Sequence, residues 1–196
     1  MTRSRMEAFS DGVIAIIITI MVLNLHQPRG DTFSSLRTIY PQLLAYALSF
    51  TNLAIYWVNH HHLLKSVRRV TAGILWSNLA LLFWLSLFPF CTRWMATDGY
   101  ASQTVAAYAI VLVLAGLAYY ILQGRIVASL RPDTGLAEVL GRDLKGRGSI
   151  VAYAVAIPLA FVWHWGAVII YVIVALVWWI PDRRLEHYLD HHAPTE

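Results

Sequence analysis

The first apolar run of the chain, residues 6–25, is the feature that most limits what this sequence can fold into. From Val13 to Leu23 the run contains a single polar residue, Thr19. At about 1.5 Å per residue, a helix over these roughly twenty residues is about 30 Å long, which matches the hydrocarbon core of a bilayer. We therefore predict that residues 6–25 form a helix that crosses a membrane.

The composition of the whole chain also indicates an integral membrane protein. Of the 196 residues, 58% are hydrophobic and only 13% are charged, whereas a soluble domain carries about 25% charged residues. Many of the eight Trp and ten Tyr lie near the ends of apolar runs, as expected for side chains at the membrane interface. The single Cys91 provides neither a disulfide framework nor a thiolate metal site.

Six apolar segments follow one another along the chain and predict an all-α protein with six transmembrane helices. They cover about residues 6–25, 40–62, 72–94, 104–123, 149–163 and 165–180. The fifth segment is short for a full crossing and contains Pro158, and His164 is expected in the turn before the sixth. We predict one transmembrane domain over residues 1–184 and a polar tail over residues 185–196.

The distribution of Lys and Arg predicts the orientation of these segments. If the N-terminus is cytoplasmic, only Arg29, Arg37 and Arg93 of the 15 Lys and Arg residues fall in outside loops. This asymmetry follows the positive-inside rule and requires an even number of crossings, with both termini in the cytoplasm. It also explains the net charge of +4 without a nucleic-acid partner.

The longest connection, residues 124–148, contains apolar residues at helical spacing. Leu136, Val139, Leu140 and Leu144 would lie on one face of a short amphipathic helix at the inner membrane surface. A solvated loop is the alternative interpretation.

One face of the first predicted helix is a continuous apolar stripe. On a helical wheel, Ile16, Ile20 and Leu23 lie within about 60° of one another, with Thr19 at the border and Asp11 almost opposite. The pattern alone fits a face that contacts lipid, packs against protein or lines a pore.

The ionisable residues near the inner ends of the first two segments need partners. A carboxylate at membrane depth is costly unless it is paired or hydrated, so Asp11 must face protein or water. It could be a structural pair with Arg5, Ser10 or the His cluster 60–62, or part of a proton relay.

Three adjacent His cannot share one helix face, so we predict no metal site. We find no phosphate-binding loop and no Gly-x-Ser-x-Gly motif, and predict no enzyme.

Four stretches of the sequence resemble one family. They are Arg5-x-x-x-Phe9-Ser10-Asp11-Gly12 leading into an Ile-rich helix with Thr19, Trp57-x-Asn59-His60-His61, the stretch from Asn78-Leu79 to Pro89-Phe90, and Trp179-Ile180-Pro181-Asp182-Arg183-Arg184. These stretches are similar to the bacterial branch of the lysosomal/endosomal transmembrane potassium channel family. The resemblance covers nearly the whole chain.

The resemblance implies a homotetramer of six-helix subunits in which the first helix of each subunit lines a central pore. This chain lacks a Thr-Val-Gly-Tyr-Gly filter, as the family does. By the resemblance, Ile16 occupies the constriction, Thr19 the position linked to potassium preference, and Ile20 and Leu23 further pore-facing positions. The residues that match the network behind the pore helix are Arg5, Phe9, Ser10, Asp11, Trp57, Asn59 and His60. Which of the three adjacent His joins this network stays open.

We therefore predict a potassium-selective channel of a bacterial cytoplasmic membrane. The channel would need no bound cofactor, and its partners would be K+, the lipid bilayer and three further copies of the chain. Apolar side chains would form its constriction and discriminate modestly between potassium and sodium. The alternatives are a proton-coupled secondary transporter that uses Asp11 and a His of residues 40–62, and a membrane enzyme or haem protein that uses the His cluster.

Overall fold

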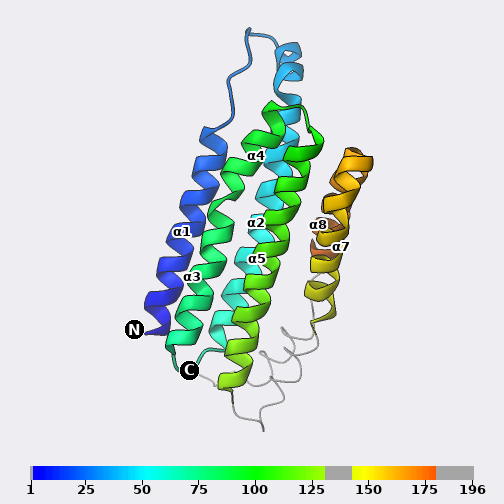
Figure 1. Ribbon diagram of the computed structural model, residues 1–196. Helices are drawn as coiled ribbons and strands as arrows, with labels where there is room; N and C mark the ends of the chain where they lie inside the picture. Colours follow the sequence, from blue (N-terminus) through cyan, green and yellow to red (C-terminus); the bar gives the residue numbers. More distant parts are fainter. Residues whose placement is uncertain (1, 131–142, 180–196) are drawn as a thin grey trace.

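The computed structural model describes residues 2–130 and 143–179, and all regular secondary structure in these ranges is helical (Figure 1). In chain order the elements are α1 (Arg3–Leu23), the 3-10 helix η1 (Phe33–Ile39), α2 (Tyr40–Lys65), α3 (Ala72–Ser86), α4 (Phe88–Thr97), α5 (Ser102–Ser129), α7 (Leu144–Val162) and α8 (His164–Trp179). The predicted tail, residues 185–196, lies outside the described residues.

Within the described residues, four helices are long and apolar enough to cross a membrane. They are α1, the pair of α3 and α4 counted as one span (Ala72–Thr97), α5 and α7. Helix α8 is also apolar but is shorter. The less apolar α2 carries polar side chains such as Asn52 and His60, which are only 3% and 1% exposed because they face the other helices. The chain is therefore a multi-pass membrane protein.

The third predicted segment differs from the prediction because it consists of two helices, α3 and α4, that meet at Leu87. Pro89 is in the first turn of α4, where its missing N–H group is tolerated. A continuous helix through this position would need that N–H to bond the carbonyl of Leu85. The helix therefore ends at Ser86 and restarts.

The fifth predicted segment is longer than expected, because α7 begins at Leu144 instead of residue 149. The carboxylate of Asp143 accepts a hydrogen bond from the backbone N–H of Gly146 at 2.7 Å and so caps the helix. With 19 residues, α7 is not short for a crossing. The helix predicted around Leu136, Val139 and Leu140 falls outside the described residues.

The turn between α7 and α8 is formed by Trp163, not by His164, which is the first residue of α8. The ring of Trp163 packs over Gly166, where an added Cβ would lie 2.5 Å from Trp163 Cε3. Glycine at this position therefore allows the tight connection.

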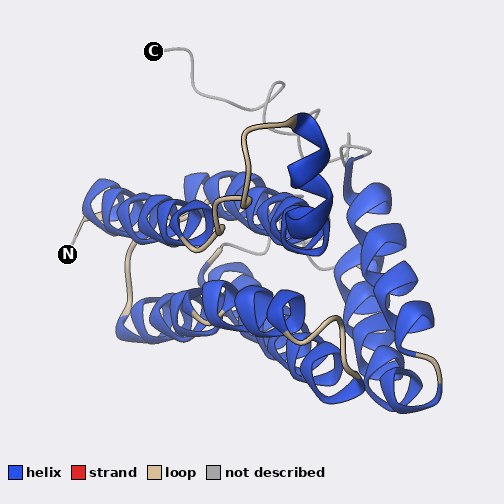
Figure 2. Cartoon of the chain, turned by 90° about the horizontal axis from the view of Figure 1, so that it is seen from above, coloured by secondary structure: helices blue, strands red, loops and turns tan. Residues whose placement is uncertain are grey.

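The helices form a bundle with α1 on one side and the pair α7 and α8 on the opposite side (Figures 1 and 2). The first helix packs against α2, α3 and α4, and α5 packs against α3, α4 and α7. The N-terminus of α1, the α2–α3 turn, the end of α5 and the start of α7 all lie at the same end of the bundle.

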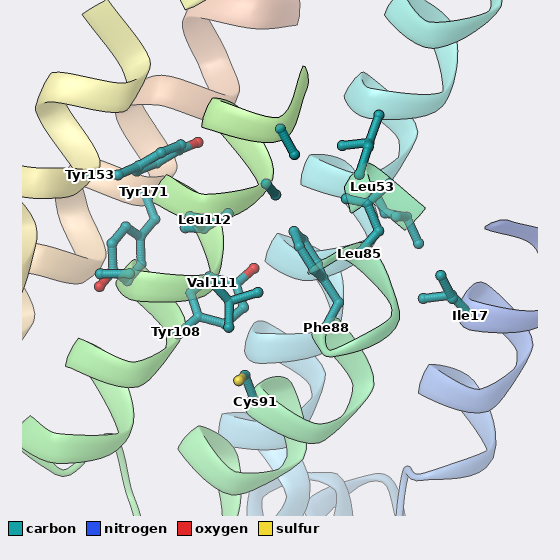
Figure 3. Close-up of a cluster of buried hydrophobic side chains, with 14 of the residues drawn as sticks. Ile17, Leu53, Leu85, Phe88, Cys91, Tyr108, Val111, Leu112, Tyr153 and Tyr171 are labelled. Carbon is teal, nitrogen blue, oxygen red and sulfur yellow. The ribbon is translucent and has the colours of Figure 1, made fainter. Parts of the chain in front are cut away.

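Aromatic and hydroxyl side chains connect the helices in the core, as Figure 3 shows. The ring of Tyr108 on α5 lies between those of Phe88 and Tyr171, at centroid distances of 5.9 and 5.4 Å. Its hydroxyl is 3.0 Å from Ser49 Oγ, which accepts a hydrogen bond from Thr92 at 2.6 Å. These buried polar groups therefore satisfy one another across α2, α4 and α5.

Tyr100 anchors the connection between α4 and α5. Gly99 and Tyr100 both adopt positive φ angles, 59° and 63°, which reverse the chain within a few residues. Burial raises the pKa of the Tyr100 hydroxyl to about 12, so it stays protonated and donates to the carbonyl of Pro41 at 2.8 Å. Its ring stacks on Trp165 of α8 at 5.3 Å.

We predict that Tyr108→Phe lowers the free energy of unfolding by about 1 kcal/mol, because it removes one buried hydrogen bond without changing the ring. The control is Tyr40→Phe, whose side chain is 58% exposed and should change stability by less than about 0.5 kcal/mol. Reversible denaturant titration in mixed micelles measures both values. Equal effects of the two variants would contradict the prediction.

Candidate functional site

The first helix has two different faces, and one of them is packed into its own protomer. Its buried residues recur at helical spacing: Met6, Ser10, Ile14, Ile17 and Met21. They contact α2, α3 and α4. The helix is therefore held in one rotational orientation by a mainly apolar contact that includes the buried hydroxyl of Ser10.

The other face of α1 is the exposed stripe, which we define as Ile16, Thr19, Ile20 and Leu23. The three apolar side chains are 59%, 43% and 80% exposed in the single chain. The Thr19 hydroxyl donates to the carbonyl of Ile16 at 2.8 Å. Because that bond uses the proton, the lone pairs of the hydroxyl oxygen remain available as a cation ligand on this face.

Three contacts at regular intervals join the N-terminal half of α1 to the end of α2, and we call them the polar ladder. Trp57 Nε1 donates to Asp11 Oδ1 at 2.9 Å, His61 Nδ1 lies 3.0 Å from Glu7 Oε1, and Arg3 Nη1 donates to the carbonyl of Lys65 at 3.1 Å. From one contact to the next, the residue number falls by four on α1 and rises by four on α2. This spacing is expected for two antiparallel helices, because residues four apart lie on the same helix face. The rings of Trp57 and His61 also stack, with centroids 6.2 Å apart.

A buried chain of hydrogen bonds links α1, α3 and α2 behind the ladder. Ser10 Oγ donates to the carbonyl of Met6 at 2.9 Å and accepts from Asn78 Nδ2 at 2.9 Å. Asn78 Oδ1 lies 2.7 Å from His60 Nε2. With this amide orientation, Asn78 Oδ1 can only accept, so Nε2 of His60 carries the proton.

The structure brings Ser10, Asp11, Trp57 and His60 into these contacts, but it differs from the prediction for Arg5, Phe9 and Asn59. The side chains of Arg5 and Phe9 are exposed, and Phe9 is 51% exposed, because both continue the exposed stripe toward the N-terminus. Asn59 donates to the carbonyl of Ile55 on its own helix, and its own carbonyl accepts from Tyr119 of α5.

Sequence reasoning missed Glu7 and Asn78 as members of the network. The signal for Glu7 was present, because Glu7 and Asp11 are four residues apart and so are Trp57 and His61. The signal for Asn78 was a polar amide inside an apolar run, which needs a partner in the membrane. Neither signal identified the partner.

The adjacent His60 and His61 bond different helices, and the ring of His62 lies 5.8 Å from that of His61. His60 contacts Asn78 and is 1% exposed, whereas His61 contacts Glu7 on a different helix. In residues 2–130 and 143–179, no group of three or more His, Cys, Asp or Glu side chains is arranged to hold a metal ion.

Comparisons with known proteins point to one family. A family model described as endosomal/lysosomal potassium channel TMEM175 matches residues 5–89. A protein of Chryseobacterium sp. (strain P1-3) named potassium channel is 47% identical over 192 residues, which cover 98% of this chain and 100% of that protein. A Rattus norvegicus protein named endosomal/lysosomal proton channel TMEM175 is 31% identical over 115 residues, covering 53% of this chain and 23% of that protein.

A solved structure shares the fold of the chain. The crystal structure of a lysosomal potassium-selective channel TMEM175 homologue from Chamaesiphon minutus matches it with a TM-score of 0.79 and 27% sequence identity. The match covers 93% of this chain and 97% of that one.

We predict that Asn78→Leu lowers the free energy of unfolding by about 2 kcal/mol, because it leaves the buried His60 Nε2–H without an acceptor. Ser77→Ala is the matched control, since the Ser77 hydroxyl donates to the carbonyl of Gly73 on its own helix. Denaturant titration in micelles gives both values. If both variants lose the same stability, the bond between Asn78 and His60 contributes nothing specific.

Proposed function

Because the chain belongs to the endosomal/lysosomal potassium channel TMEM175 family, and is therefore an ion channel and not an enzyme, we propose that four copies of it form a potassium-selective pore lined by α1. The membrane enzyme considered as an alternative above is thus wrong. The tetramer, the constriction and the potassium preference are our proposal.

The exposed stripe on α1 is the observation that carries this proposal. A single protomer has a packed core, and the cavity between α2, α5 and α7 holds only about 50 Å³, too little for an ion path. A pore must therefore form between copies, most simply around a symmetry axis. The stripe lies on the side of α1 that its own protomer leaves uncovered. The helix itself lies at the edge of the bundle (Figure 2).

Four copies of the stripe would make stacked apolar rings of Ile16, Ile20 and Leu23. Such rings gate by dewetting, because methyl groups do not replace the water that a cation loses. The sequence lacks the Thr-Val-Gly-Tyr-Gly filter motif, so in this proposal selectivity would depend on the ring diameter and on the Thr19 oxygen, whose proton is bonded to the carbonyl of Ile16. We therefore propose modest discrimination of potassium over sodium.

The proposed topology has six crossings formed by α1, α2, the pair α3 and α4, α5, α7 and α8, within a domain of residues 1–184. Both termini would lie in the cytoplasm of a bacterium. Arg3, Lys65, Arg125 and Arg147 support this orientation, because all four belong to helix ends at the same end of the bundle. We propose that no bound cofactor is needed.

The proton-coupled transporter lacks the contact on which that alternative depended. Asp11 bonds the indole N–H of Trp57, which is a donor only and cannot relay a proton. His60 and His61 contact Asn78 and Glu7 instead. These contacts favour a structural role for Asp11.

We predict that Ile16→Asn raises the potassium current by roughly tenfold, since a polar ring hydrates the constriction and lowers the barrier by about 1.4 kcal/mol. Val22→Asn is the control, because Val22 is 45% exposed on α1 but lies outside the stripe. Single-channel recording in bilayers separates an effect on conduction from one on channel number. An unchanged current in Ile16→Asn would mean that this face does not line the pore.

We also predict that Thr19→Val moves the potassium-to-sodium permeability ratio toward one, because it removes the hydroxyl oxygen and keeps the shape. Thr19→Ser retains the oxygen and should retain the ratio. Reversal potentials under bi-ionic conditions measure it. A valine variant with the original ratio would exclude Thr19 from selectivity.

A further inference from the structure

The first turns of α1 carry an arginine in line with the exposed stripe. At about 100° per residue, Arg5 lies only about 20° around the helix from Ile16, and Phe9, between them, also lies about 20° from Ile16. The side chains of Arg5 and Phe9 are both exposed in the single chain. A symmetry axis that faces Ile16 therefore also faces Phe9 and Arg5.

The guanidinium of Arg5 is not neutralised by its own protomer. In the part of the chain that the structure describes, no hydrogen bond or ion pair engages it. The two carboxylates of α1 face α2 instead. Glu7 Oε1 lies 3.0 Å from His61 Nδ1, and Asp11 Oδ1 accepts from the indole of Trp57. The acids of the helix are thus engaged on the side opposite to Arg5.

In the tetramer proposed above, on which this inference rests, four Arg5 side chains surround the axis. They lie roughly 16 Å along the helix from the ring of Ile16, at the cytoplasmic mouth of the pore. Four like charges around one path repel one another and lower the local concentration of K+. Each guanidinium also presents a planar fork of N–H donors that matches the oxygens of a phosphate group. A multivalent anion on the axis would remove the repulsion and accept from these donors.

The number and position of the charges select the kind of anion. One phosphate group has too few oxygens for four forks, whereas several linked phosphate groups carry enough charge and enough oxygens to contact the whole ring. Phe9 lies about 6 Å further into the membrane, and its side chain is 51% exposed. Its apolar ring cannot replace the water around a phosphate, so the anion stays at the mouth.

We propose that the cytoplasmic mouth binds one soluble polyphosphate anion per four chains through Arg5, and that this anion blocks the entry of K+. The site is incomplete in a single chain, because each copy contributes one guanidinium. A lipid headgroup does not reach it, because the axis is enclosed by the four copies.

Isothermal titration calorimetry of the purified channel with tripolyphosphate measures both the affinity and the stoichiometry. We expect one anion per four chains and weaker binding of inorganic phosphate. Arg5→Gln should lower the affinity by at least about a hundredfold, because each charge-assisted contact contributes roughly tenfold and all four are lost.

Arg3→Gln is the matched control for this titration. Arg3 lies two residues away on the other side of α1, where it donates to the carbonyl of Lys65, so its loss should leave the affinity unchanged. An equal loss of affinity in the two variants, or a ratio of one anion per chain, would show that general surface charge binds the anion and would overturn the proposal.

Single-channel recording tests the block. Tripolyphosphate should reduce the potassium current when it is added on the side of the α1 N-terminus, and the current through Arg5→Gln should not respond. A wild-type current that stays unchanged at saturating tripolyphosphate would overturn the block and leave the proposed pore intact. Failure of the proposed function itself gives a different result, because the wild-type chain would then carry no potassium current before any anion is added.

Discussion

The structure depends on the difference between the two faces of α1, one of which is buried in the protomer and the other exposed. Two carboxylates on this helix, Glu7 and Asp11, lie at or near membrane depth, where contact with lipid would cost several kcal/mol. They bond His61 and Trp57 of α2. This pairing, together with the packed apolar face of α1, holds the helix in one rotation about its axis, and the same rotation turns the exposed stripe away from the protomer. A turn of the helix by one residue would break the ladder and bury part of the stripe.

The central position of α2 explains why it is the least apolar of the long helices. Its polar groups form hydrogen bonds to helices on two sides of the bundle. His60 and His61 face α3 and α1, whereas Asn52 contacts Tyr153 of α7 and the Asn59 carbonyl accepts from Tyr119 of α5. Because each has a partner in the protein, their burial in a membrane is tolerated. The same helix therefore bonds α1 and α3 on one side of the bundle and α5 and α7 on the other.

Local patterns predicted the helical regions well and their ends less well. The break at Leu87 and the start of α7 depend on Pro89 and on the Asp143 cap, two short-range effects that hydropathy does not register. The network was predicted only in part. Arg5 and Phe9 were grouped with Ser10 and Asp11 because they share a motif, yet they lie on another face of the same helix.

The sequence by itself determined the class of protein, the apolar stripe on the first helix and the family, because these follow from composition, helical periodicity and motifs. Only the tertiary structure decided which polar groups meet. That Glu7 pairs with His61, and Ser10 with His60 through Asn78, depends on the axial register and rotation of three helices. Register and rotation result from packing summed over the whole bundle, which no local stretch of sequence encodes.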